Sequence, residues 1–526
     1  MADVFKTPGV YIKEIPTLPP SVAEVETAIP AFIGYTEKAI FNGKSLNLQP
    51  IRITSLLEYE QLFGFAQKEI AIAVTITDTG TGDDTFRTIT ADLGTDSRSR
   101  FKMYYGLQMY FANGGGPCYI VSVNNYPAGT PSDGNIAADD LRNGLNEIAK
   151  VDEPTLLVFP DAVSLNPSQY HALMNEALMQ CFTLQDRFTI MDVLHVTGTP
   201  NEINSSVDGF RNEATLGNNL DLLKYGAAYF PNLETSLPYR FEDAGVNIIY
   251  IQDGTTQTDT DETSDNTTTG LINLGTIKTP PADLKPAVRD GLNLKKPAPS
   301  VPLTSPITPP PDPEVAGNTE LYNQIKLELI KITVEMPPSA AVAGVYAAVD
   351  SARGVWKAPA NVTLAYTNAA KVKISHNDQM SMNVDPTSGK SINAIRYFTG
   401  KGVMIWGART LAGNDNEWRY ISSRRFFNFA EESIKKGSEW VVFEPNDANT
   451  WVRVKAMIES FLIKQWRAGA LAGAKPEHAF FVKVGLGVTM TALDILEGRM
   501  NIEIGMAVVR PSEFIVLKFS HKLQES

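Results

Sequence analysis

The chain has 526 residues, of which 43% are hydrophobic and 20% are charged. This length exceeds what one hydrophobic core usually serves, so we expect two or three domains, and the composition excludes a wholly disordered chain. The formal net charge of -13 argues against a dedicated nucleic-acid binder, which needs a surplus of Lys and Arg. No apolar run approaches the roughly 18 residues of a transmembrane helix, so we expect no direct membrane insertion.

The cysteine content and the N-terminal residues bear on where the chain folds. Its 2 cysteines, Cys118 and Cys181, offer neither a disulfide framework nor a metal-ligand pair. The first residues contain no apolar signal segment. We therefore expect folding in the cytoplasm, with any later exit by another route.

Residues 1–30 are predicted to form an extended arm. Several prolines in this stretch fix φ and oppose helix formation, while "GVYIKEI" (9–15) is rich in β-branched and aromatic residues. An isolated strand this short is not stable alone, so it must pair with something. The partner is either another molecule or the arm's own domain, in which case this is an ordinary first strand.

Residues 31–100 are predicted to be an outer β-rich segment. "AFIG" (31–34) indicates a strand, and a short helix over 55–64 is capped by Ser55 and ended by Gly64. The turn-rich residues 70–100 predict a surface β-hairpin.

Residues 101–233 show the clearest alternation of helix and strand, which implies right-handed crossovers and a mostly parallel sheet. The predicted elements are helices from 101, over 137–150, 167–183 and about 201–216, and strands over 118–123, 155–159, 188–193 and 225–229. We assign this part to an inserted α/β domain. Residues 318–360 return to the same pattern.

Between these parts, residues 234–317 are the least core-like stretch. The first half is acidic and Thr-rich, and residues 280–313 are rich in proline, which holds a backbone extended. We expect a loop-rich outer insertion on the surface, with mobile loops.

No motif for catalysis, cofactor binding or metal binding is complete. The 5 histidines form no HExxH pattern, no GxSxG elbow is present, and two GKS tripeptides lack the glycine that a phosphate loop needs. We therefore expect no enzymatic activity, no cofactor and no metal. A triad assembled from distant residues remains open, so the alternative is a soluble α/β enzyme with a site at the sheet of residues 118–230.

The C-terminal part, together with "TPGVYIKEIP" (7–16), resembles the sheath proteins of contractile phage tails and phage-tail-like injection systems. The phrases that carry the resemblance are "VMIWGARTL" (403–411), "YISSRRFFNFAEESI" (420–434), "VVFEPNDANTWVRV" (441–454), "FLIKQWRAGALAG" (461–473) and "PSEFIVLKFS" (511–520).

The resemblance implies a structural subunit, with an α/β multidomain fold and an inner domain of mixed β-sheet with flanking helices over residues 361–510. Such subunits polymerise as stacked helical rings around an inner tube and contract to drive it through a target envelope. The implied partners are further copies of the chain, an inner tube protein, and baseplate and terminal cap proteins, with paralogous sheath subunits as a further candidate. The implied location is a phage tail or a phage-tail-like particle, extracellular or membrane-anchored.

The resemblance also implies two arms that add strands to sheets of neighbouring subunits. The N-terminal arm would use Val10, Tyr11, Ile12, Lys13 and Ile15. The C-terminal arm, residues 511–526, would use Phe514, Ile515, Val516, Leu517 and Phe519.

A helix from about 448 to 471 is the candidate tube-facing element. Its apolar residues recur at helical spacing from Trp451 to Leu462 and predict one buried stripe. Arg453, Lys464 and Arg467 lie off or beside that stripe, where they could meet acidic groups of the tube. The alternative is a solvated basic face. For the whole chain, a non-contractile capsid or surface-layer protein is a further alternative to the sheath.

Overall fold

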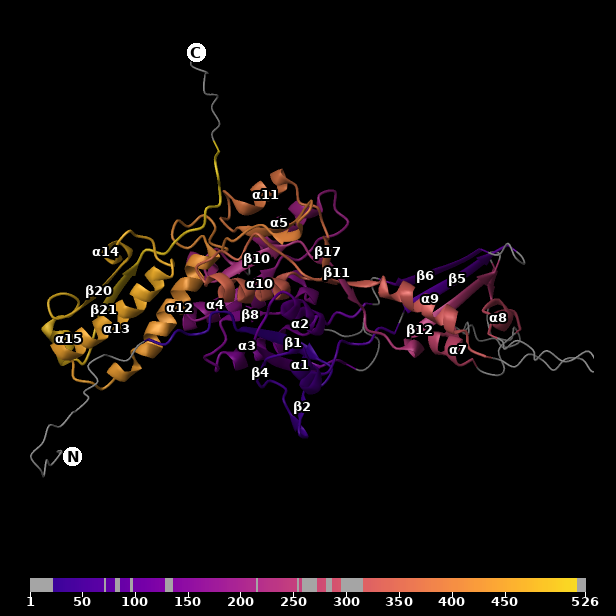
Figure 1. Cartoon of the computed structure of the whole chain (residues 1–526), viewed down its shortest axis with the longest axis horizontal. Coiled ribbons are helices and arrows are strands. Elements are labelled where there is room, and N and C mark those ends of the chain that lie inside the picture. The colour runs from indigo at the N-terminus through magenta and orange to yellow at the C-terminus, as the bar shows by residue number, and fades with distance from the viewer. Residues whose placement is uncertain are drawn as a thin grey trace, which may run out of the picture. The chain divides into compact units, whose positions relative to one another are not determined.

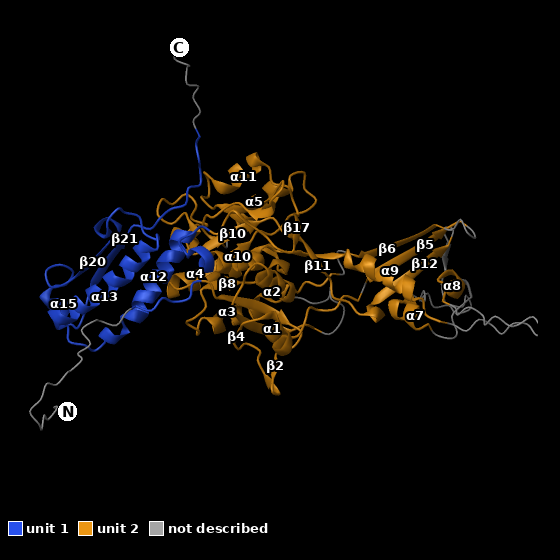
Figure 2. Cartoon of the chain, in the orientation of Figure 1, with its two compact units in different colours: residues 1–27, 350–358, 422–526 blue, residues 28–349, 359–421 orange. Residues whose placement is uncertain are grey.

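The computed structural model describes residues 22–70, 72–80, 86–94, 98–127, 136–213, 216–252, 255–257, 272–280, 286–294 and 316–517. The chain forms two compact units (Figures 1 and 2). Unit 1 comprises Met1–Thr27, Asp350–Ala358 and Ser422–Ser526. Unit 2 comprises Ala28–Val349 and Pro359–Ile421. Each unit therefore collects stretches that are far apart in the sequence.

A nine-stranded sheet forms the centre of unit 2, in the order β16-β19-β18-β10-β9-β8-β1-β7-β4. The pairings from β18 to β7 are parallel, and β4, β19 and β16 add antiparallel edges. The strands are β1 (Pro30–Thr36), β4 (Ile51–Ile53), β7 (Cys118–Asn125), β8 (Leu156–Val158), β9 (Phe188–Asp192), β10 (Gly226–Phe230), β16 (Val362–Thr363), β18 (Ile392–Phe398) and β19 (Gly402–Ile405).

Helices cover both faces of this sheet, so successive residues of a strand enter different cores. In β1, Phe32 joins one hydrophobic cluster, and Ala31 and Ile33 join the other. The predicted α/β fold class and its alternating elements are confirmed. The helices are α1 (Leu56–Phe63), α2 (Met103–Ala112), α3 (Ala138–Ile148), α4 (Pro167–Leu184), α5 (Glu202–Asn212), α6 (Leu220–Leu223), α10 (Ser339–Arg353) and α11 (His376–Asn383).

A smaller sheet in unit 2 has the order β13-β12-β5-β6, and β14 also pairs with β12. The predicted hairpin is present as the antiparallel pair β5 and β6. β12 lies parallel to β5 and places Val246, Ile248 and Tyr250 in the core. The elements are β5 (Ile72–Thr79), β6 (Phe86–Leu93), β12 (Val246–Gln252), β13 (Thr255–Gln257), β14 (Ile272–Asn273), α7 (Leu274–Lys278), α8 (Pro286–Gly291) and α9 (Thr319–Ile330).

The described residues of 234–317 are more regular than the sequence indicated, because they supply strands and helices with buried apolar side chains. The loop-rich character of the rest of this stretch remains a prediction. One further strand there, β11 (Leu233–Pro238), pairs with β15 (Thr333–Met336) and β17 (Thr367–Ala370). A short surface hairpin, β2 (Ile40–Phe41) and β3 (Lys44–Ser45), completes unit 2.

Unit 1 is a helix pair packed against a two-stranded ribbon. α12 (Ile421–Gly437) and α13 (Ala448–Arg467) run side by side (Figure 1), and their aromatic side chains share one hydrophobic cluster. The remaining elements of this unit are α14 (Pro476–Ala479), β20 (Phe480–Val484), α15 (Ala492–Leu496) and β21 (Ile502–Met506).

The two units differ from the seven-part division expected from the sequence. β1 belongs to the parallel sheet rather than to a separate outer segment, since it pairs with β7 and β8. β18 pairs with β10, so residues 359–421 join unit 2, and the C-terminal compact unit begins at Ser422 rather than at 361. The finer boundaries remain a prediction.

A buried carboxyl group links the central sheet to α10. Asp192 ends β9 with only 2% of its surface exposed, and its Oδ1 accepts a hydrogen bond of 2.8 Å from the backbone N–H of Ser339 at the start of α10. Burial raises the pKa of Asp192 to about 7. Burial likewise raises the pKa of Glu69 to about 7 and that of Asp161 to about 6.

These raised values predict a pH-dependent stability. An unfolded Asp titrates near pH 4, so between about pH 4 and 7 folded Asp192 keeps a proton that the unfolded chain releases. Stability therefore falls as the pH rises through this window. Asp192→Asn should keep the acceptor for Ser339 and reduce the fall in unfolding midpoint temperature between pH 5 and 7. Asp139→Asn, at an exposed carboxylate, is the control and should leave the slope unchanged. An equal fall in midpoint temperature for Asp192→Asn and wild type would contradict a contribution of Asp192 to the pH dependence.

Candidate functional site

The candidate tube-facing helix, α13, is held in unit 1 by one buried stripe. Asp447 caps its N-terminus by accepting a hydrogen bond of 3.0 Å from the backbone N–H of Thr450. The predicted stripe is confirmed, because Val454, Ile458, Phe461 and Leu462 are all buried. Phe461 lies 5.9 Å from Phe429 of α12, measured between ring centroids. These contacts fix which face of α13 points outward.

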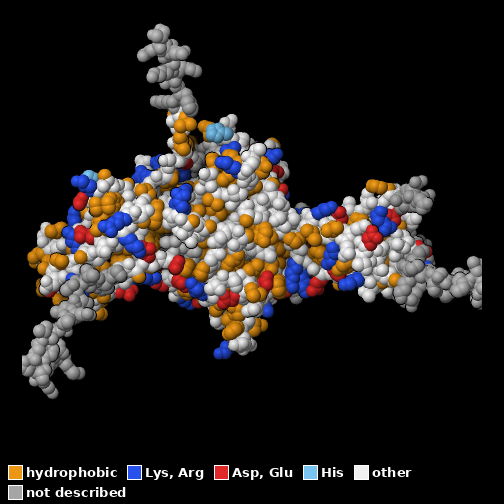
Figure 3. Space-filling model, viewed as in Figure 1, with side chains coloured by type: hydrophobic (Ala, Val, Ile, Leu, Met, Phe, Trp, Pro, Cys, Tyr) orange, Lys and Arg blue, Asp and Glu red, His pale blue; other side chains and the backbone are white. Residues whose placement is uncertain are grey.

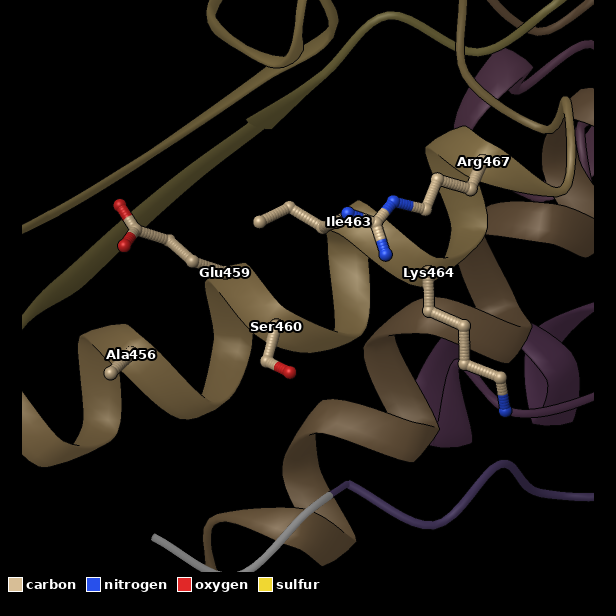
Figure 4. A pocket seen from close by; sticks show the side chains of 6 residues that line it. All are labelled: Ala456, Glu459, Ser460, Ile463, Lys464 and Arg467. Carbon is tan, nitrogen blue, oxygen red and sulfur yellow. The ribbon is translucent and has the colours of Figure 1, made fainter. Parts of the chain in front are cut away.

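The outward face of α13 carries the three cations singled out in the sequence. Arg453, Lys464 and Arg467 are all exposed. Eleven residues are close to three turns, so Arg453 and Lys464 lie nearly in line, and Arg467 follows one turn beyond Lys464. The same face contains an open groove (Figure 4). The residues that line it are Ala456, Glu459, Ser460, Ile463, Lys464 and Arg467.

Two of the three cations already have partners inside unit 1. The Arg453 guanidinium lies 4.5 Å from the centroid of the Trp440 ring. The Lys464 ammonium lies 2.8 Å from a carboxylate oxygen of Glu24. Arg467 makes no ion pair with any residue that the structure describes. The structure thus brings the three predicted residues onto one exposed face, but it leaves that face less strongly charged than their number indicates.

The ribbon of β20 and β21 packs its apolar side chains against α13. Phe480 and Val482 of β20 are buried, while Phe481 and Lys483 between them are exposed. The two strands pair along five positions, from Phe480 opposite Met506 to Val484 opposite Ile502. Along these positions, neither strand pairs with a third strand of the described chain. A two-stranded ribbon therefore presents two unpaired edges.

The residues that follow the ribbon are apolar and exposed. Phe514, Ile515, Val516 and Leu517 have 72%, 77%, 78% and 71% of their surface exposed. Figure 3 shows hydrophobic side chains at the surface just before the end of the described chain. Residues 511–517 form no strand.

Other predicted arm residues cannot be placed. Phe519 lies outside the described residues, and so do all five residues of the N-terminal arm, Val10, Tyr11, Ile12, Lys13 and Ile15.

A buried ion pair that sequence reasoning missed ties together the three stretches of unit 1. The Arg425 guanidinium on α12 donates to the two carboxylate oxygens of Asp350, at 3.0 and 2.5 Å. It also donates to the backbone carbonyl of Thr27 at 2.7 Å. The side chains of Arg425 and Asp350 are only 3% and 4% exposed. Nothing in the sequence pairs residues this far apart, so only the fold could identify them.

Neither a metal-binding cluster nor a helix suited to crossing a membrane is found among the described residues. No group of three or more His, Cys, Asp or Glu side chains in that part of the chain is arranged to hold a metal ion. None of the described helices is both long enough and apolar enough to cross a membrane.

The chain is similar to known proteins in two comparisons. Residues 413–522 match the phage tail sheath C-terminal domain family. No curated protein matches the chain.

Solved structures resemble the chain over nearly its whole length. The sheath complex of the extracellular contractile injection system PVC, in the contracted state, is 26% identical, with a TM-score of 0.59 and coverage of 99% of each chain. The contracted helical sheath of the anti-feeding prophage is 29% identical, with a TM-score of 0.58, 99% of this chain and 100% of that chain. A chain of the baseplate of the same prophage is 28% identical, with a TM-score of 0.56 and the same coverage.

In its fold and in these comparisons, the chain is similar to contractile sheath proteins. The resemblance found in the sequence is confirmed, and so is the prediction of a structural sheath subunit at this level. The relatives are sheath components of an extracellular contractile injection system and of the anti-feeding prophage. Their structural role favours a structural role here over the enzyme alternative.

The Arg425 contact generates a stability prediction. Arg425→Ala leaves the Asp350 carboxylate buried without its main partner, and removing one member of a buried pair costs about 3–5 kcal/mol. We expect a correspondingly lower midpoint for unfolding of unit 1 in chemical denaturation. Lys435→Ala is the control, because that side chain is 66% exposed and its ion pair is worth at most about 1 kcal/mol. Equal midpoints for the two variants would contradict the role of Arg425.

Proposed function

We propose that the chain polymerises as stacked helical rings around an inner tube and contracts to drive that tube through a target envelope. Further copies of the chain, the tube protein and baseplate and cap proteins are its partners, with paralogous sheath subunits as a further candidate. The similarity to two sheaths in the contracted state supports this proposal. The extracellular PVC relative favours an extracellular particle over a membrane-anchored one.

The observation that carries the proposal is the unpaired ribbon of unit 1 together with the exposed apolar segment that follows it in the sequence. A two-stranded ribbon is marginally stable in water, and its open edges offer backbone donors and acceptors to an added strand. Residues 514–517 are four successive apolar residues that the described chain leaves exposed. Burying a large apolar side chain fully contributes about 1.5–3 kcal/mol. Joining a sheet that buries these side chains would therefore stabilise the segment.

We therefore assign β20 and β21 as the acceptor ribbon and the two arms as donors from neighbouring subunits. Backbone hydrogen bonds give such strand addition its affinity, and alternate side chains give it specificity. The donor strands are predicted at Val10–Ile15 and Phe514–Phe519. Links of this kind persist while rigid units rotate and slide, as contraction requires.

The exposed face of α13 is the proposed contact with the inner tube. Its small residues, Ala456 and Ser460, let a partner approach closely, and Arg467 offers a cation that no described carboxylate neutralises. Exposed ion pairs are worth only about 0–1 kcal/mol each, which suits a surface that must release its partner. A tube with acidic groups along this groove fits these features.

Negative-stain electron microscopy of the protein expressed alone tests the assembly itself. We expect hollow helical tubes, because strand exchange needs only further copies of the chain. Monodisperse particles under all conditions would contradict assembly without partners and would return attention to the enzyme and the surface-layer alternatives.

Removal of either arm should abolish these tubes. We expect deletion of residues 1–20 or of residues 511–526 to leave a folded monomer, since the cores of both units lie outside these segments. Deletion of residues 521–526 is the control, because it spares both predicted donor strands. Microscopy and sedimentation give the assembly state, and thermal unfolding checks the fold. Normal polymerisation of both long deletions would rule out the arm hypothesis.

Charge reversal on α13 tests the tube contact separately. We expect Lys464→Glu combined with Arg467→Glu to weaken co-assembly with the inner tube by about tenfold, while sheath polymers without a tube still form. Co-sedimentation with pre-assembled tubes measures the effect.

Lys455→Glu is the matched control, because Lys455 lies on another side of the same helix and is only partly exposed. Unchanged tube binding by the double variant would remove Lys464 and Arg467 from the interface. Loss of tube-free polymers would instead place them between sheath subunits.

A further inference from the structure

Residues 22–27, which we call the strap, lie along α12 within unit 1. The backbone N–H of Val25 donates to Ser433 Oγ at 3.2 Å. The backbone carbonyl of Thr27 accepts from the Arg425 guanidinium at 2.7 Å. Backbone atoms of the strap are thus held at two points of α12 that lie about two turns apart.

Packing and charge fix the other end of the strap. Val22 packs closely over Gly437: a Cβ atom there would lie 2.9 Å from Val22 Cγ2, so a side chain at position 437 would displace Val22 from its present place. Glu24 reaches α13, where one carboxylate oxygen accepts from both Lys464 Nζ and Gln465 Nε2, each at 2.8 Å.

The contact between Glu24 and Lys464 is open to exchange. The side chains of Lys464 and Glu24 are 70% and 38% exposed, so a carboxylate of another molecule can reach the ammonium group. An exposed pair of this kind contributes about 0–1 kcal/mol, and comparable pairs therefore replace one another readily. Gln465, which is buried, can still hold Glu24 when Lys464 turns away.

We propose that Glu24 and an acidic group of the inner tube compete for Lys464. The proposal rests on the proposed function, because it takes α13 as the tube-facing helix. When the tube leaves, Glu24 receives the lysine, so that release does not leave an unpaired cation on α13. When the tube binds, Lys464 exchanges one carboxylate for another, and the strap keeps its remaining contacts with Ser433, Arg425 and Gln465.

The competition gives the strap a regulatory role. The strap directly follows residues 1–21, which contain the predicted N-terminal donor strand. Lys464 would therefore contact both the inner tube and the strap to which that donor strand is attached. The Glu24 carboxylate lowers the affinity for the tube by the strength of one exposed ion pair. The sheath thus carries its own weak competitor of the tube.

Glu24→Gln tests this competition in the full-length protein. The amide oxygen can still accept from Gln465, but the negative charge that holds Lys464 is gone. We expect this variant to bind pre-assembled inner tubes of the same particle about two- to fivefold more tightly than wild type, as the loss of an exposed competing pair predicts. Co-sedimentation at low ionic strength gives the largest difference, because salt screens exposed pairs.

Glu26→Gln is the matched control. It removes the same charge two positions along the strap, at an exposed carboxylate that pairs with no described cation, and it should leave tube affinity at the wild-type value. In a Lys464→Met background the effect of Glu24→Gln should vanish, since the competed side chain is absent.

Each result decides the matter. Tighter binding by Glu24→Gln alone, lost in the Lys464→Met background, supports the competition. Affinity equal to that of Glu26→Gln, or weaker than that of wild type, overturns it and leaves the tube contact in place. Absence of tube binding by the wild-type protein would overturn the tube-facing assignment of α13 and this inference with it.

Discussion

The Arg425 guanidinium is the contact on which unit 1 depends, because it joins all three stretches of chain that build the unit. It belongs to α12, it pairs with Asp350 at the end of α10, and it binds the carbonyl of Thr27 in the strap. A buried charge that loses its partner is costly, so none of the three stretches is stable in its place without the others. The helix pair, the strap and the ribbon are therefore expected to form together.

The helices and strands that the sequence predicted correctly are those with a clear local periodicity. Strands buried on both faces appear as short apolar runs, such as 156–158, and amphipathic helices appear between them. The position of β18 in the parallel sheet could not be predicted, because parallel pairing leaves no local pattern in the sequence. β12 was missed for another reason: its apolar residues stand next to an acidic, Thr-rich stretch whose composition dominated the interpretation.

The candidate site on α13 could also be predicted only in part. Helical spacing was enough to predict the buried stripe of α13, and with it the outward direction of Arg453, Lys464 and Arg467. The state of those cations was not predictable. Glu24 is separated from Gln465 by 441 positions, so the carboxylate that occupies this face could be found only from the fold. A count of basic residues on a helix therefore overstates the charge that the helix presents to a partner.

The weak charge that α13 presents matters for how a sheath could hold a tube and still release it. Contacts of about 0–1 kcal/mol are negligible for one subunit, but they add up when many subunits face the same tube. Release from such a surface can proceed subunit by subunit, and each step breaks only a weak contact. The proposed competition by Glu24 would lower the free energy needed for each step further, because Glu24 pairs with the freed ammonium group of Lys464. The strands that link subunits have the opposite requirement, since they must persist throughout contraction. Backbone hydrogen bonds and buried apolar side chains would supply that persistence. The two surfaces proposed for these tasks, the exposed face of α13 and the ribbon, share the small core of unit 1.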